Sequence, residues 1–499
     1  MSLSTTERVV PDELWEQVFL HLDYPSVLRC KQACRLFSGI ITASAEIQYR
    51  GELTMDCMID TGMSNLPITD RLTLLRKRRF AWDNLQWNVL PKKTIPAANT
   101  YHTYDFVAGT YALIGGDEFI AVTLPTTAHQ GIQKTHTLDF RALDFVMDPT
   151  QDVVIFLGYQ MTADPSSTYL YVRTYESMTP HPQSEQSRIL VNSSSRSRVY
   201  QLHLNGDIFA LANSHPTRDA EIRIWNWKTA KLIIELTVTN SRAESFAFLS
   251  SEAFAMVIRT DSGYISIYDV SSGTEISRLR FPELTYGSLS SAIVDTPPFL
   301  AQPRPDCVVA TSPKHRIHTF MLTYASDESD YNLQAYILNE FLLSYATPPT
   351  AGQGSSIHIK DVRWEDWGPH NTRIVQVELF RNYPHYFSQG LRVVLPVKRS
   401  DWQLCILDFN IHRKLADRPE KPKAQVTTVA HPTTISNSEL GFPLFKYDVE
   451  TYLPYILHRR VIPDPFPVGL AIPILLSECH IAAVNDLDPD DSYIFSMEL

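Results

Sequence analysis

The chain has 499 residues. This is about three times the size of a common domain, so we expect one small domain and one large one. Hydrophobic residues make up 44% and charged residues 20% of the chain, which excludes wholesale disorder. The formal net charge of −11 argues against a general nucleic-acid-binding surface, although a local basic patch stays possible. The 32 prolines argue against long helical bundles, and the 11% share of aromatic residues favours strands.

Six cysteines in a chain of this length are too few for a disulfide scaffold. Cys30 and Cys34 lie four residues apart, but no second close pair is present to complete a structural zinc site, so we expect neither metal nor cofactor. The first residues lack the apolar stretch of a signal peptide. The most apolar run, residues 466–476, is too short to span a bilayer. We therefore expect a protein of the cytoplasm or nucleus without membrane association.

The first fifty residues predict three short helices. Pro11 suits the first position of a helix, and the acidic residues after it suit the positive end of the helix dipole. Ser26 is the expected N-cap of a second helix, and residues 35–49 form a third helical stretch. The apolar residues of the first helix span an arc of about 140°, wider than one neighbouring helix covers. These are Leu14, Trp15, Val18, Phe19 and Leu22.

The surplus apolar face needs a partner, because three short helices form only a small core. One interpretation is a helical cap that docks on the large domain of the same chain. The other is a module that binds a different protein. Periodicity alone leaves both open.

Residues 10–14 (Val-Pro-Asp-Glu-Leu), the pair Val18-Phe19, Leu22, Leu28 and residues 33–37 (Ala-Cys-Arg-Leu-Phe) together resemble the F-box motif. The resemblance covers residues 10 to about 50 and departs from the family at Val10, where a Leu is usual, and at Ala33, where a Val is usual. It implies binding to the Skp-type adaptor of cullin-based ubiquitin ligases. The implied adaptor-binding positions are Val10, Pro11, Leu14, Val18, Phe19, Leu22, Leu28, Cys34, Arg35 and Phe37. Among them, Pro11, Leu14, Phe19 and Leu22 would lie in the contact. Cys34, Arg35 and Phe37 would hold the second and third helices.

A further helix is expected over residues 69–87, where apolar residues alternate with a basic run from Arg71 to Arg79. The run could suggest a phosphate or nucleic-acid site, but solvated charge at a linker helix is the preferred interpretation. Pro91 and Pro96 mark a boundary near residue 95. The expected organisation is an F-box module over residues 8–52, a helical linker over 53–95 and a large domain over 96–499.

Beyond residue 95 the chain alternates apolar and polar residues in short runs, which is typical of an all-β domain. The segment around Trp225 repeats around Tyr268, 43 residues later. The predicted strands before and after the Trp225 segment also match those before and after the Tyr268 segment, in the same order. A period of 40–45 residues with four short strands is typical of a WD-type β-propeller blade. No Gly-His dipeptide is present, so the propeller would be of a divergent kind.

Weaker copies of the pattern occur at residues 119–124, 170–174, 316–322, 404–409 and 493–497. They predict about seven blades, with insertions near 176–197, 325–370 and 413–440. The expected fold class is therefore α+β and multidomain: a small all-α F-box followed by an all-β propeller. A pair of β-sandwich domains is the alternative, although sandwiches require no repeat of blade length.

Two aromatic-rich segments, residues 364–370 and 381–387, are candidates for binding a target protein, because exposed Trp, Tyr and Arg anchor interfaces. The candidate residues are Trp364, Trp367, Arg381, Tyr383, His385 and Tyr386. Alternatively, these aromatic side chains pack insertions onto the rim of the propeller. Arg218, Arg223, Arg259, Arg278 and Arg316 are available for a phosphorylated target if they share one mouth of the ring.

No motif for an enzyme is present: the chain lacks a nucleophile elbow, a P-loop and a His-Glu-x-x-His zinc motif. We therefore expect a non-catalytic adaptor that links an unidentified target protein to a Skp-type subunit and through it to a cullin, with no nucleic acid involved. Alternatives are a propeller scaffold or ligand-binding protein with no ligase role, or a hydrolase with a spatially assembled site.

Overall fold

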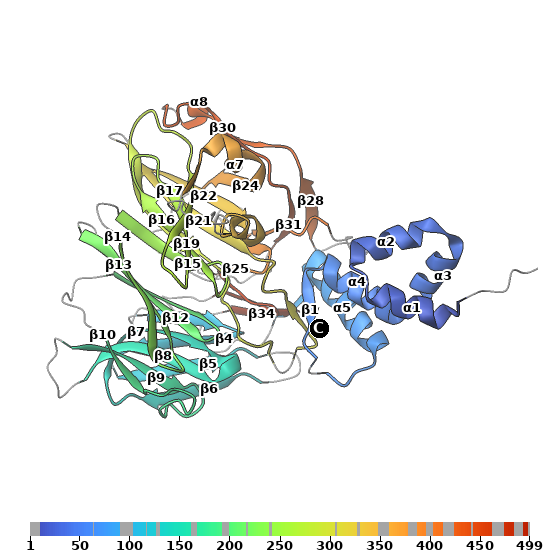
Figure 1. Cartoon of the computed structure of the whole chain (residues 1–499), viewed down its shortest axis with the longest axis horizontal. Coiled ribbons are helices and arrows are strands. Elements are labelled where there is room, and N and C mark those ends of the chain that lie inside the picture. Colours follow the sequence, from blue (N-terminus) through green and yellow to red (C-terminus); the bar gives the residue numbers. More distant parts are fainter. Residues whose placement is uncertain are drawn as a thin grey trace, which may run out of the picture.

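A computed structural model describes residues 10–62, 64–89, 103–115, 117–125, 130–160, 167–191, 199–215, 218–238, 242–304, 307–326, 330–347, 359–377, 387–395, 403–412, 424–440, 443–461, 474–483 and 493–497. The helices of the N-terminal part project from one side of a large β-domain (Figure 1). Among the described residues, no helix is long and apolar enough to cross a membrane.

The N-terminal module contains four helices rather than three: α1 (Asp12–Leu20), α2 (Tyr24–Ala33), α3 (Arg35–Ala43) and α4 (Ala45–Met55). The third predicted stretch is divided at Ser44, whose hydroxyl accepts the Ile47 N–H at 3.2 Å and so begins α4 as an N-cap. The predicted cap at Ser26 is wrong. Asp23 caps α2 and accepts the Ser26 N–H at 2.9 Å, because Pro25 has no N–H and suits the first turn.

The helix of the linker, α5 (Ile68–Asp83), packs beside α4 through its basic run. Arg79 forms ion pairs with Asp56 at 2.8 Å and Glu52 at 3.0 Å, and Arg76 contacts Glu52 at 2.6 Å. Buried Arg78 donates to the carbonyl of Glu478 in the β-domain. The basic run therefore holds the linker in place rather than forming an open anion site. The expectation that its charges are solvated is wrong for Arg78 and Arg79, because both side chains are largely buried in these contacts.

The β-domain contains seven sheets of four or five strands among its described residues. Sheet 1 contains β3 (Thr103–Val107), β4 (Thr110–Gly115), β5 (Glu118–Thr123) and β6 (Ile132–Thr137). Sheet 2 contains β7 (Arg141–Asp148), β8 (Val153–Tyr159), β9 (Thr168–Thr174) and β10 (Arg188–Val191), with a short turn η2 (Pro149–Gln151) after β7. Sheet 3 contains β11 (Val199–Asn205), β12 (Ile208–His215), β13 (Arg218–Asn226) and β14 (Lys231–Val238).

Sheet 4 contains β15 (Arg242–Phe248), β16 (Ala253–Arg259), β17 (Tyr264–Asp269) and β18 (Glu275–Arg280), with β23 (Lys360–Val362) added in parallel. Sheet 5 contains β19 (Ser288–Asp295), β21 (Ile317–Ala325), β22 (Asp330–Leu338) and β24 (Thr372–Gln376). Sheet 6 contains β25 (Ser388–Gln389), β26 (Arg392–Leu395), β27 (Gln403–Asp408), β31 (Tyr455–Val461) and β28 (Gln425–Val429). Sheet 7 contains β32 (Ile474–Leu476), β33 (His480–Ala483), β34 (Tyr493–Met497) and β2 (Trp87–Val89).

Two small ribbons and three short helices complete the described elements. The ribbons are β1 (Met58–Asp60) with β20 (Val309–Thr311) and β29 (Thr433–Ile435) with β30 (Val449–Thr451). The helices are α6 (Asn339–Leu343), α7 (Trp364–Asn371) and α8 (Asn437–Leu440), where the sequence pattern predicted none.

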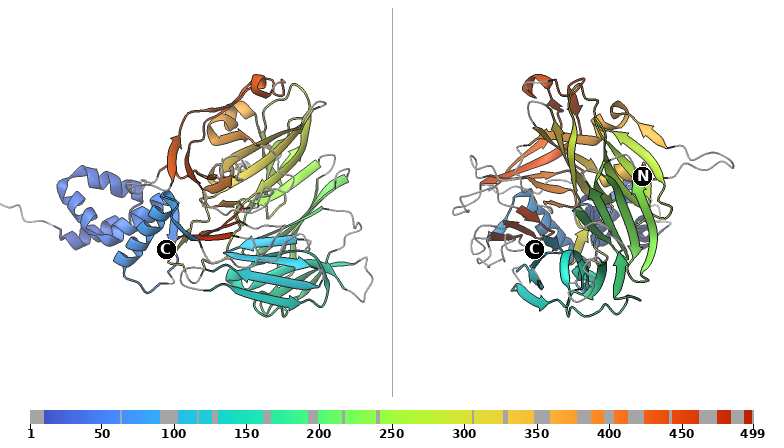
Figure 2. Two further views of the ribbon diagram at one scale, coloured as in Figure 1. Left: turned by 180° about the vertical axis from the view of Figure 1, so that it is seen from behind. Right: turned by 90° about the vertical axis from the view of Figure 1, so that its left-hand side faces the viewer.

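The seven sheets form a closed ring, which makes the domain a seven-bladed β-propeller with each sheet as one blade. The right-hand view of Figure 2 shows the sheets arranged around an axis. The first strands of the first five sheets contact one another in order. Hydrogen bonds join them: Asp105 of β3 accepts the Met147 N–H of β7 at 2.9 Å, and Ser245 of β15 accepts the Val294 N–H of β19 at 2.9 Å. Leu113 of blade 1 packs with Leu475 of blade 7, which closes the ring.

The core lies between blades, and this explains the strand sequences. The second strand of a blade is covered on both faces, so β8 reads Val-Val-Ile-Phe-Leu-Gly-Tyr and its first six residues are buried. Phe119 of blade 1 and Phe156 of blade 2 meet edge to face, with ring centroids 5.5 Å apart. Fourth strands such as β14 have one exposed side and alternate in burial. The repeat predicted from the sequence matches blades 3 and 4, and the weaker copies match strands of blades 1, 2, 5, 6 and 7.

Candidate functional site

The N-terminal module leaves an apolar surface uncovered along α1 and the start of α2. Leu14 is 56% exposed, Val18 47%, Leu22 39% and Leu28 40%. Residues 14, 18 and 22 are spaced by four, so they lie along one face of α1 and its continuation. We refer to these four side chains as the α1–α2 apolar surface. Half-exposed aliphatic side chains of this kind each gain roughly 1 kcal/mol when a partner covers them completely.

Phe19, which the sequence placed in the contact, lies inside the module instead. It is 2% exposed and packs with Val27, Ile40, Ile41 and Ile47. It follows Val18 on α1 by one residue, so its side chain points about 100° away from the uncovered face. The prediction that Phe19 lies in the contact is therefore wrong. It contributes to the interior that supports α1.

Cys34, Arg35 and Phe37 lie where α2 ends and α3 begins. The Cys34 sulfur accepts the Phe37 N–H at 3.5 Å and serves as the N-cap of α3, and Arg35 is exposed on its first turn. The Phe37 ring lies 4.7 Å from Trp15 and 5.1 Å from Phe19 between centroids. The three residues thus join the second and third helices, as the resemblance implies.

Val10 and Pro11 precede α1. Val10 is half-buried, and Pro11 is exposed and holds the N-cap position rather than the first helical position.

The module is joined to the propeller through its far end, so the α1–α2 apolar surface is not covered by blades. Strand β1 pairs with β20, Asn410 donates to the Met55 carbonyl at 2.8 Å, and Arg78 reaches Glu478. The cluster around Phe19 contains only residues of the module itself. Figure 2 (left) shows α1 to α3 pointing away from the sheets. The interpretation as a helical cap, which needs Leu14 and Leu22 buried against the propeller, is not supported.

The joint defines two faces of the propeller. Each of the three contacts involves a connection between the first and second strands of a blade or between its third and fourth strands. Because neighbouring strands are antiparallel, these connections lie at the same end of the ring. We call this end the module face. The far face carries the connections between second and third strands and those between blades.

The connection between β19 and β20 crosses the module face. We refer to residues 296–304 and 307–308 as the cross-loop. Ala301 N–H donates to Asp148 of blade 2 at 2.9 Å, and Phe299 bridges to Asn205 of blade 3. Arg304 lies so close to the turn of blade 1 that a Cβ at Gly109, which has φ +72°, would sit 2.6 Å from its Nη1. The cross-loop therefore covers the inner turns on this face. On the far face, the segment at residues 443–446 lies against the connection at 281–287: the Thr285 N–H donates to the Leu444 carbonyl at 2.9 Å, and the Lys446 N–H donates to the Glu283 carbonyl at 2.9 Å.

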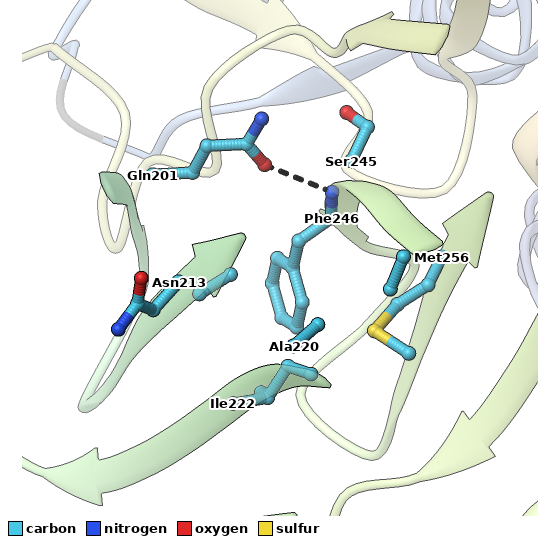
Figure 3. Close-up of a pocket in the computed structure, with 9 residues that line it drawn as sticks. Gln201, Asn213, Ala220, Ile222, Ser245, Phe246 and Met256 are labelled. Atoms are coloured by element: carbon cyan, nitrogen blue, oxygen red, sulfur yellow. Dashed lines mark hydrogen bonds between the residues drawn. The ribbon is translucent and has the colours of Figure 1, made fainter. Parts of the chain in front are cut away.

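A shallow pocket lies between blades 3 and 4 near the far face (Figure 3). It contains about 230 Å³ of empty space, part of it open to solvent. Gln201 Oε1 accepts the Phe246 N–H at 3.1 Å on its wall, and Met256 and Ile222 supply apolar contacts. Asn213 is 6% exposed, and its Oδ1 has no hydrogen-bond partner among the described residues. The enclosed part of the pocket measures only about 10 Å³, enough for about one water molecule and far below a small-molecule cleft, so the pocket is not a ligand site.

The two tryptophans predicted to bind a target are buried rather than exposed. Trp364 and Trp367 lie on helix α7 and are buried, 7% and 1% exposed, and the Trp367 Nε1–H donates to the Arg280 carbonyl at 2.9 Å. They pack the insertion onto blades 4 and 5, where the two Trp side chains bury a large apolar area. This agrees with the alternative interpretation of these aromatic residues. Arg381, Tyr383, His385 and Tyr386 lie outside the described residues.

The candidate phosphate-binding arginines are engaged within the propeller. Arg223 pairs with Glu235 at 2.6 Å, Arg278 pairs with Glu275 at 2.6 Å, and Arg259 donates to the Ser290 carbonyl. Arg316 is 6% exposed and lies over the ring of Phe299. The side chain of Arg218 is not among those described. Four of the five guanidinium groups thus make contacts within the propeller and do not form a shared binding site for a phosphorylated target.

The described residues contain no group of three or more His, Cys, Asp or Glu side chains that could hold a metal ion. Among the described residues, the feature that remains as a candidate site is the α1–α2 apolar surface.

Comparison with known proteins finds a family match within the helical module. The F-box domain family matches residues 10–45. No curated protein matches the chain. Among solved structures, the N-terminal domain of Nup159 has 12% identity and a TM-score of 0.33, with 82% of this chain and 94% of that chain covered. A chain of the mitotic checkpoint complex has 11% identity and a TM-score of 0.36, covering 82% and 91%.

Proposed function

Because the chain carries an F-box domain at residues 10–45 in front of a seven-bladed β-propeller, we propose that it is the substrate-recognition subunit of an SCF-type ubiquitin ligase. The F-box would bind a Skp-type adaptor, and through it a cullin, while the propeller would bind a target protein. The chain would form and break no bonds itself. It would raise the effective concentration of the target at the site of transfer.

The observation that carries the proposal is the α1–α2 apolar surface. A soluble domain rarely leaves four large apolar side chains together at 39–56% exposure without a partner for them. Their position on a matched F-box supports a Skp-type adaptor as the partner.

The experiment is the double substitution Leu14→Asp with Val18→Asp in the full chain. Two charges would have to be buried without partners in the complex, so we expect the affinity for the Skp-type adaptor to fall at least about 100-fold. Ile132→Asp, at a 60% exposed position on β6, is the matched control and should bind normally. Undiminished binding by the double variant, with an unchanged circular dichroism spectrum, would refute the contact.

We place target binding on the far face, because the linker and the cross-loop occupy the other one. With a target bound, amide hydrogen exchange should slow in the exposed far-face connections at residues 261–262 and 286–287. The turns at 228–230 and 271–274 lie on the module face and should exchange as before. Protection confined to the latter turns would contradict the placement.

A further inference from the structure

The α1–α2 apolar surface is shared between two helices that an exposed turn joins. Leu14 and Val18 lie on α1, and Leu28 lies on α2. Leu22 lies between them in the turn at residues 21–23, and all three residues of this turn are exposed. Because an exposed turn does little to fix two helices, the shape of the surface depends on what holds the end of α1 and the start of α2.

Helix α4 holds the end of α1 through Arg50. The Arg50 Nη1 donates to the Leu20 carbonyl at 3.0 Å, and the Arg50 Nη2 pairs with Glu46, one turn earlier on α4, at 2.7 Å. The Leu20 carbonyl is one of the last four in α1, and such carbonyls have no partner within their own helix. Since the last turn of α1 contains no basic residue, Arg50 also supplies the positive charge that is favoured at this end of the helix dipole.

The next residue of α4, Gly51, holds the start of α2. Tyr24 is the first residue of α2, and its hydroxyl donates to the Met55 sulfur at 3.3 Å. The Tyr24 ring lies on Gly51 so closely that a Cβ there would be 2.2 Å from the ring Cε2 and 2.8 Å from Cδ2. A helix interior favours alanine over glycine, so the glycine weakens α4. The close approach of the ring is the reason that glycine fits at this position.

We propose that Gly51 and Tyr24 are positioning residues for the adaptor contact, with Arg50 as a second hold. Gly51 is buried, so it acts on the contact only through Tyr24. Helix α4 serves as the common support of α1 and α2, and it sets the distance between the two halves of the α1–α2 apolar surface. This inference rests on the proposed function, because it assumes that a Skp-type adaptor binds that surface.

The test measures the affinity of the full chain for a purified Skp-type adaptor, together with the melting temperature. In Gly51→Ala the added methyl group displaces the Tyr24 ring and the start of α2. We expect the affinity to fall about 10-fold and the melting temperature to fall as well. In a Tyr24→Ala background the same substitution meets no ring. There it should leave the affinity of the background unchanged and raise its melting temperature, because alanine suits a helix better than glycine.

Leu53→Ala is the matched control for a general loss of stability. Leu53 lies about 200° around α4 from Gly51 and packs with Leu72 and Leu75 of α5. Its truncation should lower the melting temperature but leave the adaptor affinity within about 2-fold of the parent chain. Should Gly51→Ala fold poorly, Tyr24→Phe and Tyr24→Ala test the same contact. The first keeps the ring and should bind as the parent chain, and the second should bind more weakly.

Two results would overturn the proposal: parental affinity in Gly51→Ala, or an equal loss of affinity in Gly51→Ala and Leu53→Ala. A further loss on adding Gly51→Ala to the Tyr24→Ala background would also contradict it, because the two residues would then act independently. If the parent chain itself does not bind the adaptor, the proposed function fails. The opposite changes in melting temperature in the two backgrounds would still report the contact of Gly51 with Tyr24.

Discussion

Phe19 and Leu14 have different roles in the F-box module, because Phe19 supports its interior and Leu14 is exposed on its surface. Both are large and apolar, and both belong to the motif, but Phe19 is 2% exposed and Leu14 is 56% exposed. A buried Phe replaced by Ala typically costs 3–5 kcal/mol of stability, whereas a change at an exposed position usually costs under about 0.5 kcal/mol. Loss of adaptor binding through Phe19 would therefore report unfolding, and only the exposed residues can report the contact.

His318 is a buried histidine whose tautomer the structure fixes. The Asn339 amide donates to the Leu249 carbonyl, so its Oδ1 faces His318 and accepts the Nε2–H at 2.8 Å. The Nδ1 is then free of a proton and accepts from Thr296 at 2.9 Å. Burial, with a smaller effect from the charge of Arg316, lowers the pKa of His318 to about 4.

This shift predicts a dependence of stability on pH. The unfolded chain binds a proton at His318 below about pH 6.5 while the folded chain stays neutral, so stability falls as the pH drops from 6.5 through 4. The contribution of His318 amounts to roughly 3 kcal/mol at most. Urea unfolding near pH 7 and near pH 4.5 should show a smaller loss on acidification in His318→Gln than in the parent chain. Equal losses would mean that His318 is protonated in the fold.

At the scale of elements, the β1–β20 ribbon joins the F-box module to the propeller. The Thr61 N–H donates to the Val308 carbonyl and the Ser312 N–H to the Cys57 carbonyl. Hydrogen-bonded pairs alternate along an antiparallel ribbon, so Ala310, opposite Ile59, also takes part in the ladder.

Ala310→Pro should open this ribbon. Proline removes the N–H and costs about 3 kcal/mol or more in such a position. We expect amide exchange at residues 58–60 to accelerate roughly 100-fold. Ala310→Gly keeps the N–H and should change the exchange far less. Adaptor binding should survive in both variants, and its loss would indicate that the ribbon supports the F-box itself.

At the scale of the whole molecule, the ring is closed by strands from opposite ends of the chain. Strand β2 pairs with β34, so Trp87–Val89 complete blade 7. Trp82 and Leu85, just before β2, are buried among residues of blades 5, 6 and 7. The linker is thus part of the propeller core as well as a spacer.

Two truncated chains test this closure. A chain that begins at residue 96 lacks β2 and should leave blade 7 with an unpaired edge, which lowers the melting temperature by at least about 5 °C or causes aggregation. A chain that begins at residue 56 retains β1, α5 and β2 and should melt near the temperature of the full protein. Equal melting of the two would show that the ring closes without β2.

The sequence by itself determined the local features. The F-box motif at residues 10–37 and the repeat around Trp225 and Tyr268 predicted an all-α module before a propeller, because apolar periodicity, strand alternation and blade period depend on residues close together in the sequence. Tertiary structure decided what depends on contacts between distant residues. Burial of Phe19 but not Leu14, the inward packing of Trp364 and the closure by β2 all follow from how segments pack. A linear pattern of apolar residues does not specify which face is covered.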